Sequence, residues 1–378
     1  MVESFGYVPV LPIKAGEMTA LRDLPSADKV QLTPLFVVTT GPEATEEDRW
    51  RSPEELLDTA VAEVARCWGR APFFVDLRAL GDESVAPGVH PLLRFLETAR
   101  QYGLATVPVT GLSASIAERL AVRDAVLSGG QGFCLRVPRH EWAEFRAGGS
   151  GYRTLEKLDA TPGDVDLVLD FAGTGEAAET RSDLSRTLEE LSDLNLWRSL
   201  IVTGTSYPSP RRLLRNGITE WPRQEWRRYE RLVSSSAAGR LPTFGDYGVT
   251  HPDAFQLPPY VLDVRATLRY TTSDTWLIAR GDLYSSRSGG AGVGGEAITP
   301  LARELLAHPH FGLSQHCRVE RWVSVVAHVN RGGGNPSLWH RHATNHHMVR
   351  VSEQLARLHG TGDSVSTDDV ESRPGLDL

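Results

Sequence analysis

Short apolar runs alternate with stretches of helical periodicity along most of this chain. The runs are continuous and rich in β-branched and leucine residues, as is typical of strands buried in a parallel sheet. Eight strand–helix repeats predict a closed (β/α)8 TIM-like barrel, because parallel neighbours need a helical crossover between them. The runner-up, an open doubly wound sheet, is disfavoured because no GxGxxG motif follows any run. The predicted strands are Tyr7–Ile13, Leu32–Val38, Pro72–Leu77, Ala105–Thr110, Gly132–Val137, Val165–Asp170, Ser199–Thr203 and Leu241–Asp246.

Between these runs, helix signals are clear at two places. Ser52 followed by Pro53 predicts the start of a helix over Pro53–Trp68, with the serine hydroxyl as N-cap. A long segment rich in Trp and Arg, Ile218–Ser235, predicts the seventh helix. Both elements fit the crossovers that a barrel requires.

The pattern changes after Gly248. Arg269–Arg280 predicts a β-hairpin or an edge strand pair, Ile298–Ala307 a helix, Arg321–Val329 a strand or a short helix, and Thr344–Leu358 a final helix. We therefore divide the chain into a barrel over residues 1–250 and an α+β extension over 251–360 that packs over the barrel mouth. The acidic, Ser-rich residues 361–378 are expected to be disordered.

Length and charge narrow the class of protein. A barrel commonly takes about 250 residues, so a chain of 378 residues leaves room for the extension. The net charge of −8 argues against broad nucleic-acid binding. Residues 260–360 differ from the acidic chain as a whole, because they hold 11 Arg against 7 Asp and Glu and so carry a net positive charge. That local excess favours an anionic ligand or partner.

Neither disulfides nor a membrane location are indicated. The three cysteines are far apart in the sequence and form no CxxC pair. The N-terminus lacks a basic region followed by an apolar one, and no apolar stretch approaches the length of a bilayer span. We expect a cytoplasmic protein without membrane contact.

Three aspartates end predicted strands or follow them directly: Asp76, Asp170 and Asp246. The carboxyl ends of barrel strands meet at one rim, where these side chains would supply acid and base or bind a cation. They are the candidate catalytic residues. The alternative is structural: they cap the following helices or pair with Arg78, Arg136 and Arg269.

Other polar residues near the rim suit an anionic ligand. Lys14 ends the first predicted strand, in a chain with only three lysines, and Thr203 and Ser206 follow the seventh. His342 and His346 are four residues apart, a spacing that can chelate a metal on one helix face, but without an HExxH motif they do not predict one, and the cofactor stays unknown. The candidate ligand-binding residues are Lys14, Arg136, Thr203, Ser206, Tyr247, Arg269, Tyr270, Arg280, Asn345 and His346.

Several segments together resemble the phage-associated beta protein family. They are Tyr7–Leu21, Leu32–Phe36, Gly245–Pro252, Leu268–Gly281, and Asn335 with Trp339 and Thr344–His347. The resemblance spans nearly the whole chain and implies a prokaryotic or phage protein encoded near mobile elements. The motif positions that it carries over are Lys14, Asp76, Asp170, Asp246, Tyr247, Arg269, Tyr270, Trp276, Arg280, Asn335, Asn345 and His346.

The resemblance implies a role in phage–host conflict but no reaction. Relatives tend to carry an acidic residue where this chain has Val37 and Val38, a departure that weakens an enzymatic interpretation. Two hypotheses follow. In the first, the protein is a defence or immunity component that binds an anionic small molecule, or a protein partner from the same cassette, at the barrel mouth. In the alternative, it is a hydrolase-type barrel enzyme that acts on a phosphorylated metabolite or nucleotide, with the Arg269–Arg280 hairpin and Asn345–His347 as a lid.

Overall fold

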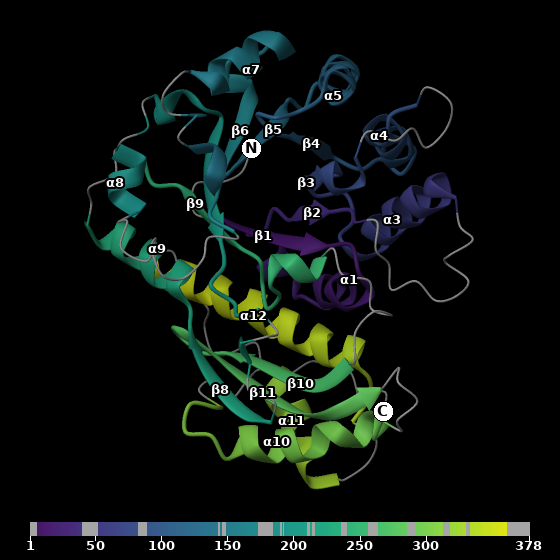
Figure 1. Ribbon diagram of the computed structural model, residues 1–378, viewed down its shortest axis with the longest axis vertical. Coiled ribbons are helices and arrows are strands. Elements are labelled where there is room, and N and C mark those ends of the chain that lie inside the picture. The colour runs from purple at the N-terminus through teal and green to yellow at the C-terminus, as the bar shows by residue number, and fades with distance from the viewer. Residues whose placement is uncertain are drawn as a thin grey trace.

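In the computed structural model, eight parallel strands close into a barrel, so the predicted (β/α)8 fold is confirmed (Figure 1). Each strand pairs with the next along the chain, and the last pairs with the first, where Val8 lies opposite Gly245. The barrel strands are β1 (Tyr7–Pro12), β2 (Leu35–Val37), β3 (Phe73–Asp76), β4 (Thr106–Thr110), β5 (Phe133–Pro138), β6 (Val165–Asp170), β7 (Ser199–Gly204) and β9 (Thr243–Asp246).

The structure describes residues 6–39, 52–81, 89–142, 144–145, 149–172, 184–189, 191, 193–209, 212–213, 216–235, 240–255, 264–285, 292–312, 318–329 and 333–360. The predicted acidic tail, 361–378, lies outside these residues.

Both faces of the barrel strands are buried, which explains why their sequences are continuously apolar. One face fills the lumen with a cluster that includes Val8, Phe74 and Val168. The other packs against the surrounding helices in the largest core of the molecule. Successive side chains along a strand point to opposite faces, so the residue two positions from a lumen residue also faces the lumen.

Helices connect the strands around the outside of the barrel. The predicted helix after Ser52 is confirmed: Ser52 Oγ accepts from the Glu55 backbone N–H, and the Glu55 carboxylate accepts from the Ser52 N–H in return. The helices of this layer are α1 (Ala15–Arg22), the short α2 (Ser26–Lys29), α3 (Pro53–Cys67), α4 (Pro91–Gln101), α5 (Ile116–Gly129), α7 (Ser150–Leu158), α8 (Leu184–Glu189) and α9 (Gln224–Ser235).

The last helix of the chain, α12 (Pro336–Leu358), completes this layer. It lies along α1, where Asn345 Nδ2 donates to the Ala20 carbonyl and His340 Nε2 lies 2.7 Å from Glu17 Oε1 (Figure 1). The helix begins before the predicted Thr344, because Asn335 Oδ1 accepts from the Leu338 N–H and forms an N-cap. The chain therefore leaves the barrel after β9 and returns to it with α12.

The intervening segment forms a second, smaller unit on the outer side of α12 (Figure 1). The predicted hairpin is confirmed as the antiparallel pair β10 (Val264–Thr271) and β11 (Thr275–Ser285). One face of this sheet packs against α10 (Ile298–Leu306) and α11 (Arg318–Val329). Of the two structures expected for Arg321–Val329, a strand or a short helix, the helix is the one found. The other face contacts Tyr207 and Val249, which follow β7 and β9.

The predicted helix over Ile218–Ser235 is wrong in its first part. Gly217–Pro222 form a strand, β8, that pairs antiparallel with β11, and only Gln224–Ser235 are helical, as α9. Local composition suited a helix, but the hydrogen-bonding partner of β8 lies about 60 residues later and is invisible to a local pattern. Two elements therefore lie on the wrong side of the boundary predicted at residue 250. β8 precedes residue 250 but belongs to the second sheet, and α12 follows it but packs on the barrel. The closure of the extension over the mouth stays a prediction.

Within the described ranges, no helix combines the length and the apolar character that crossing a bilayer would require.

Candidate functional site

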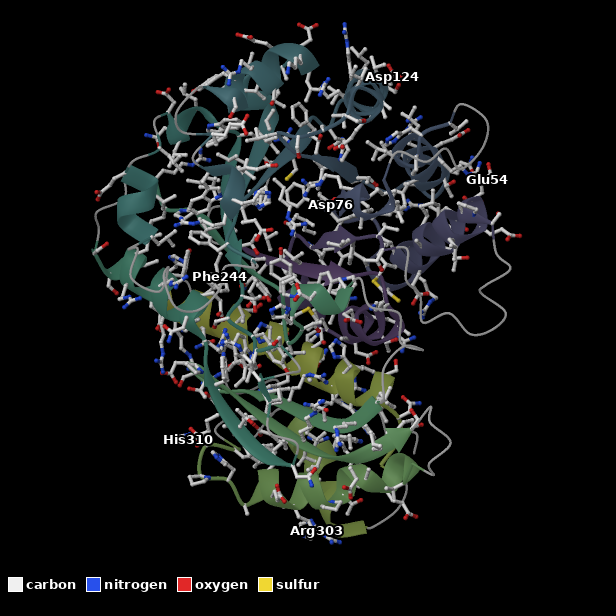
Figure 2. All side chains as sticks on the ribbon, in the orientation of Figure 1. Glu54, Asp76, Asp124, Phe244, Arg303 and His310 are labelled. Carbon is white, nitrogen blue, oxygen red and sulfur yellow. The ribbon has the colours of Figure 1, made fainter. Side chains whose placement is uncertain are left out.

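Three charged side chains meet inside the barrel where its strands end. Asp76 in β3 shares a face with Phe74, Arg136 in β5 with Cys134, and Asp170 in β6 with Val168, and those three neighbours all line the lumen. In Figure 2, Asp76 lies in the middle of the barrel. The sequence prediction that strand ends gather polar groups at one rim holds for these three positions.

Arg136 bridges the two carboxylates. Its Nη1 donates to Asp76 Oδ2 at 2.8 Å, and its Nε and Nη2 donate to Asp170 Oδ2 at 2.8 and 2.6 Å. The Tyr247 hydroxyl donates to the same Asp170 oxygen at 2.6 Å and accepts from Arg136 Nη2. Asp76 has a second cation, because Arg78 Nε and Nη2 contact its two oxygens at 3.0 and 2.6 Å. Asp76 and Asp170 thus pair with Arg78 and Arg136, as one of the two alternatives expected, and their catalytic role stays a prediction.

The network shifts the pKa values of Asp76, Tyr247 and Arg136. Burial by itself would raise the pKa of Asp76, but Arg78 and Arg136 outweigh it and hold the pKa far below the usual range. Burial raises the pKa of Tyr247. Burial tends to lower the pKa of Arg136, yet Tyr247 and the two carboxylates raise it well above its ordinary value. Asp76 thus stays ionised at physiological pH and is unsuited to donate a proton.

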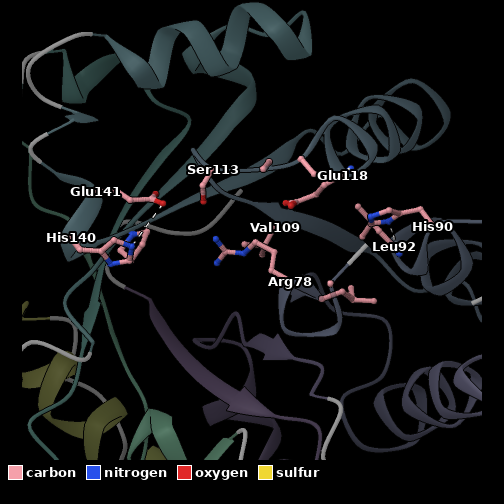
Figure 3. A pocket seen from close by; sticks show the side chains of 13 residues that line it. Arg78, His90, Leu92, Val109, Ser113, Glu118, His140 and Glu141 are labelled. Carbon is pink, nitrogen blue, oxygen red and sulfur yellow. Dashed lines mark hydrogen bonds and ion pairs between the residues drawn. The ribbon is translucent and has the colours of Figure 1, made fainter. Parts of the chain in front are cut away.

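A pocket of about 420 Å³ opens beside this network (Figure 3). The side chain of Arg78, which is 28% exposed, lies in its middle, with Glu118 and His90 on one side and His140 and Glu141 on the other. The loops after β3, β4 and β5 contribute its lining, so it belongs to the carboxyl-terminal rim where barrel sites occur.

Two helices begin at the wall of this pocket. His90 caps α4, since its Nδ1 accepts from the Leu92 N–H, and Ser115 caps α5, since its Oγ accepts from the Glu118 N–H. The Glu118 carboxylate accepts from Thr110 Oγ1 at 2.7 Å. Helix N-termini carry a positive partial charge, which adds to that of Arg78.

Asp246 does not join the other two aspartates. It shares a face of β9 with Phe244, which packs outward against Trp226 and Tyr229. Its Oδ1 accepts from Tyr7 Oη at 2.6 Å, and its Oδ2 lies 2.8 Å from His347 Nε2. Asp246 is fully buried under α12. Burial by itself would raise the pKa of this carboxyl, but His347 and Tyr7 lower it below the ordinary value.

The remaining candidates near the mouth have separate surroundings. Lys14 Nζ lies 3.4 Å from the Ala254 carbonyl. Thr203 faces the lumen, and its buried Oγ1 makes no hydrogen bond within the described part of the chain. Ser206 Oγ donates to Glu225 Oε2 and accepts from the Gln224 N–H, so it anchors the start of α9.

The candidates on the second sheet divide between its faces. Arg269 Nε donates to Tyr207 Oη at 3.0 Å, on the face toward the barrel. Burial and the positive charges of Arg265 and Arg269 lower the pKa of Arg280. Tyr270 is on the opposite face, where its hydroxyl donates to Glu320.

Asn345 and His346 are directed into the packing of α12. His346 stacks on Tyr270 with ring centroids 4.4 Å apart, and its Nε2 lies 2.9 Å from the Thr271 carbonyl. His342 instead stacks on Trp322, so the two rings at helical spacing have different partners. Among the described residues, the single group suited to a metal is Glu220, His308 and His310, which no sequence motif indicated.

No sequence motif indicated the other residues of the pocket. Arg78 was expected only as a partner for carboxylates, Ser113 only near a helix start, and neither His140 nor Glu141 was a candidate. The usable signal was position, because all four lie within four residues of the end of a barrel strand. Their residue types alone indicated nothing.

The comparison with protein families agrees with the sequence resemblance. The family described as Beta protein matches the chain over residues 7–353. Among solved structures, the chain is similar to triosephosphate isomerase from Bartonella henselae, at 12% identity and a TM-score of 0.35, over 66% of this chain and 93% of that one. No curated protein matches.

Proposed function

We propose that this chain, which belongs to the beta protein family, binds an anionic ligand in the pocket beside Arg78 at the barrel mouth. One observation carries the proposal: a guanidinium is presented into a pocket of small-molecule size. Pockets for small molecules commonly measure about 300–1,000 Å³, and this one measures about 420 Å³. A phosphorylated metabolite or a mononucleotide is of suitable size.

Arg78 is prepared for this role by its partner. Asp76 holds the guanidinium through two side-chain hydrogen bonds, which fixes the orientation of the planar group before any ligand arrives. Arginine suits phosphate and carboxylate groups because it offers several donors in a fixed fork. The starts of α4 and α5 at the same wall favour negative charge further.

The two glutamates in the lining narrow the ligand class. Glu118 and Glu141 would repel a ligand that carries only negative charge, unless it contacts them through donors. Hydroxyl or amino groups supply such donors. We therefore favour a ligand with a phosphate or carboxylate group at one end and a sugar or an amine at the other.

Binding without turnover is better supported than hydrolysis. Asp76 and Asp170 are committed to Arg78, Arg136 and Tyr247, and Asp246 faces away from them. The role in phage–host conflict, as a sensor or immunity component with a partner from the same cassette, rests on the family resemblance. The candidates Lys14, Thr203, Arg269 and Arg280 remain proposals for contacts elsewhere along the mouth.

The test compares Arg78→Met with Arg94→Met. Both arginines pair with one aspartate at 2.6 Å and are similarly exposed, at 28% and 29%, but Arg94 lies outside the pocket. Thermal shift and calorimetry would use inorganic phosphate, pyrophosphate, nucleoside monophosphates and sugar phosphates. We expect the wild type and Arg94→Met to bind at least one probe, and Arg78→Met, folded by circular dichroism, to bind it at least about tenfold more weakly.

Equal binding by Arg78→Met and the wild type would refute this site, and no binding of any probe by the wild type would refute the ligand class. Phage protection measured in cells with the same variants tests the biological role separately.

A further inference from the structure

We infer that Glu220, His308 and His310 form a binding site for a divalent transition-metal ion of the zinc class. Glu220 lies on β8, which is an edge strand of the second sheet, and the two histidines lie in the turn that follows α10. His310 is at the periphery of the second unit, well away from Asp76 in the barrel (Figure 2). The inference is therefore independent of the ligand proposed for the mouth.

The ligand atoms are already grouped. His308 Nε2 lies 3.2 Å from Glu220 Oε1, and His310 Nδ1 lies 4.0 Å from Glu220 Oε2. All three ligand atoms are within 4.8 Å of one another. Around a tetrahedral zinc ion with bonds of about 2.0–2.1 Å, ligand atoms are roughly 3.3 Å apart. Small side-chain rotations would bring this set to that spacing.

Local sequence explains why the two imidazoles point the same way. In His308-Pro309-His310 the proline presets its own φ, and the Phe311 N–H donates to the His308 carbonyl at 3.0 Å, which closes a turn. The two rings lie with centroids 5.5 Å apart. Glu220 is opposite Leu277 in the sheet, and Leu277 faces the α10 side, so the carboxylate is on the side where α10 ends.

Two imidazoles and one carboxylate are a common ligand set for zinc and related metals, and three protein ligands leave one position for water. An ion pair alone explains the arrangement less well. Glu220 is 53% exposed and His310 is 56% exposed, and an ion pair between side chains this exposed contributes little and does not order both rings around one carboxylate. A shared cation accounts for both contacts.

Metal binding would cost one hydrogen bond. The His310 backbone N–H donates to His308 Nδ1 at 3.3 Å. Once His308 Nε2 binds a metal, Nδ1 carries the ring proton and can no longer accept this bond. The contact is long for a hydrogen bond, so little is lost. In return, the ion would tie the edge strand β8 to the end of α10 and stabilise the outer side of the second unit.

The experiment uses the full chain stripped of metal with a chelator, and titrates Zn²⁺ by calorimetry and Co²⁺ by visible absorbance. His310→Ala and Glu220→Gln are compared with His328→Ala, which removes a histidine of α11 whose Nδ1 contacts the Ser324 carbonyl instead. These substitutions are on the surface and leave the core intact, which circular dichroism would verify.

We expect one Zn²⁺ per chain for the wild type and His328→Ala, a rise in melting temperature on binding, and cobalt bands of a four- or five-coordinate site. His310→Ala and Glu220→Gln should bind about 100-fold more weakly or worse, since loss of outer-shell partners alone commonly costs about 10- to 100-fold. The inference is overturned if the wild type binds no Zn²⁺ at millimolar concentration. It is equally overturned if both variants bind Zn²⁺ as the wild type does.

Discussion

Replacing Arg136 by Met should destabilise the protein more than any surface charge change. Arg136 is only 11% exposed and contacts two carboxylates that are each 4% exposed. Without it, Asp76 keeps Arg78, but Asp170 keeps only the Tyr247 hydroxyl and the Ala172 N–H among the described residues. Breaking a buried pair by removing one partner costs about 3–5 kcal/mol, and the retained partners favour the lower end, about 3 kcal/mol.

The loss should also depend on pH in a defined direction. In the wild type, the lowered pKa of Asp76 contributes stability that is present above pH 4 and is lost as pH falls below it. In Arg136→Met, the two carboxylates face each other without the bridging cation, so one of them should have a raised pKa. Protonation then relieves the repulsion, and the difference between variant and wild type should shrink from pH 7 to pH 5.

Urea unfolding of the wild type and Arg136→Met at pH 7 and pH 5 measures the loss of stability in the variant and its change with pH. Arg66→Met is the control, because Arg66 pairs with Glu63 at the surface and should cost less than about 1 kcal/mol. Adding Asp170→Asn to Arg136→Met should recover part of the loss, since it removes the charge left uncompensated. A loss below about 1 kcal/mol, or one that grows at low pH, would show that the network does not carry this energy.

Three further predictions concern other parts of the molecule. Burial lowers the pKa of His346 to about 4, below the ordinary value of 6.5, so the unfolded chain binds the extra proton between these values and stability should fall on acidification by up to about 1.4 kcal/mol per pH unit. His346→Gln should flatten that part of the urea-stability profile, and parallel profiles would contradict the assignment. Gly132→Ala should destabilise by about 2 kcal/mol or more in the same assay, because φ is +66° and the new Cβ would lie 2.2 Å from the Asp164 carbonyl, whereas Gly129→Ala meets nothing and should be neutral or stabilising. Burial raises the pKa of Cys67 to about 11, so at pH 8 its alkylation by iodoacetamide, followed by mass spectrometry, should be about 100-fold slower than in the unfolded chain, and equal rates would refute its burial.

The barrel itself was predictable because its signal is local and repeated. Each apolar run of β-branched and leucine residues is long enough for one buried strand, and polar residues such as Asp76 and Asp170 mark the strand ends. The start of α3 at Pro53 was equally readable, since Ser52 and Glu55 form a capping box within four residues. Such features depend on neighbours in sequence, which a pattern records.

The placement of side chains across the fold was not readable in the same way. Successive side chains along a strand point to opposite faces, so Phe244 and Asp246 share one face of β9. Because both faces of a barrel strand are apolar, the sequence does not show whether that face points to the lumen or to the helices. Here Trp226 and Tyr229 of α9 cover Phe244, and Asp246 consequently turns toward His347 of α12, about 100 residues away.

Long-range pairing decided the rest. β8 is a strand because β11 lies beside it, and the approach of Glu220 to His308 follows from that pairing and from the position of α10. Local residue types specify the repeating strand and helix units and the polar ends of the strands. Which of those polar ends come together depends on contacts between residues far apart in the chain, and these form only when the whole barrel closes and α12 returns to it.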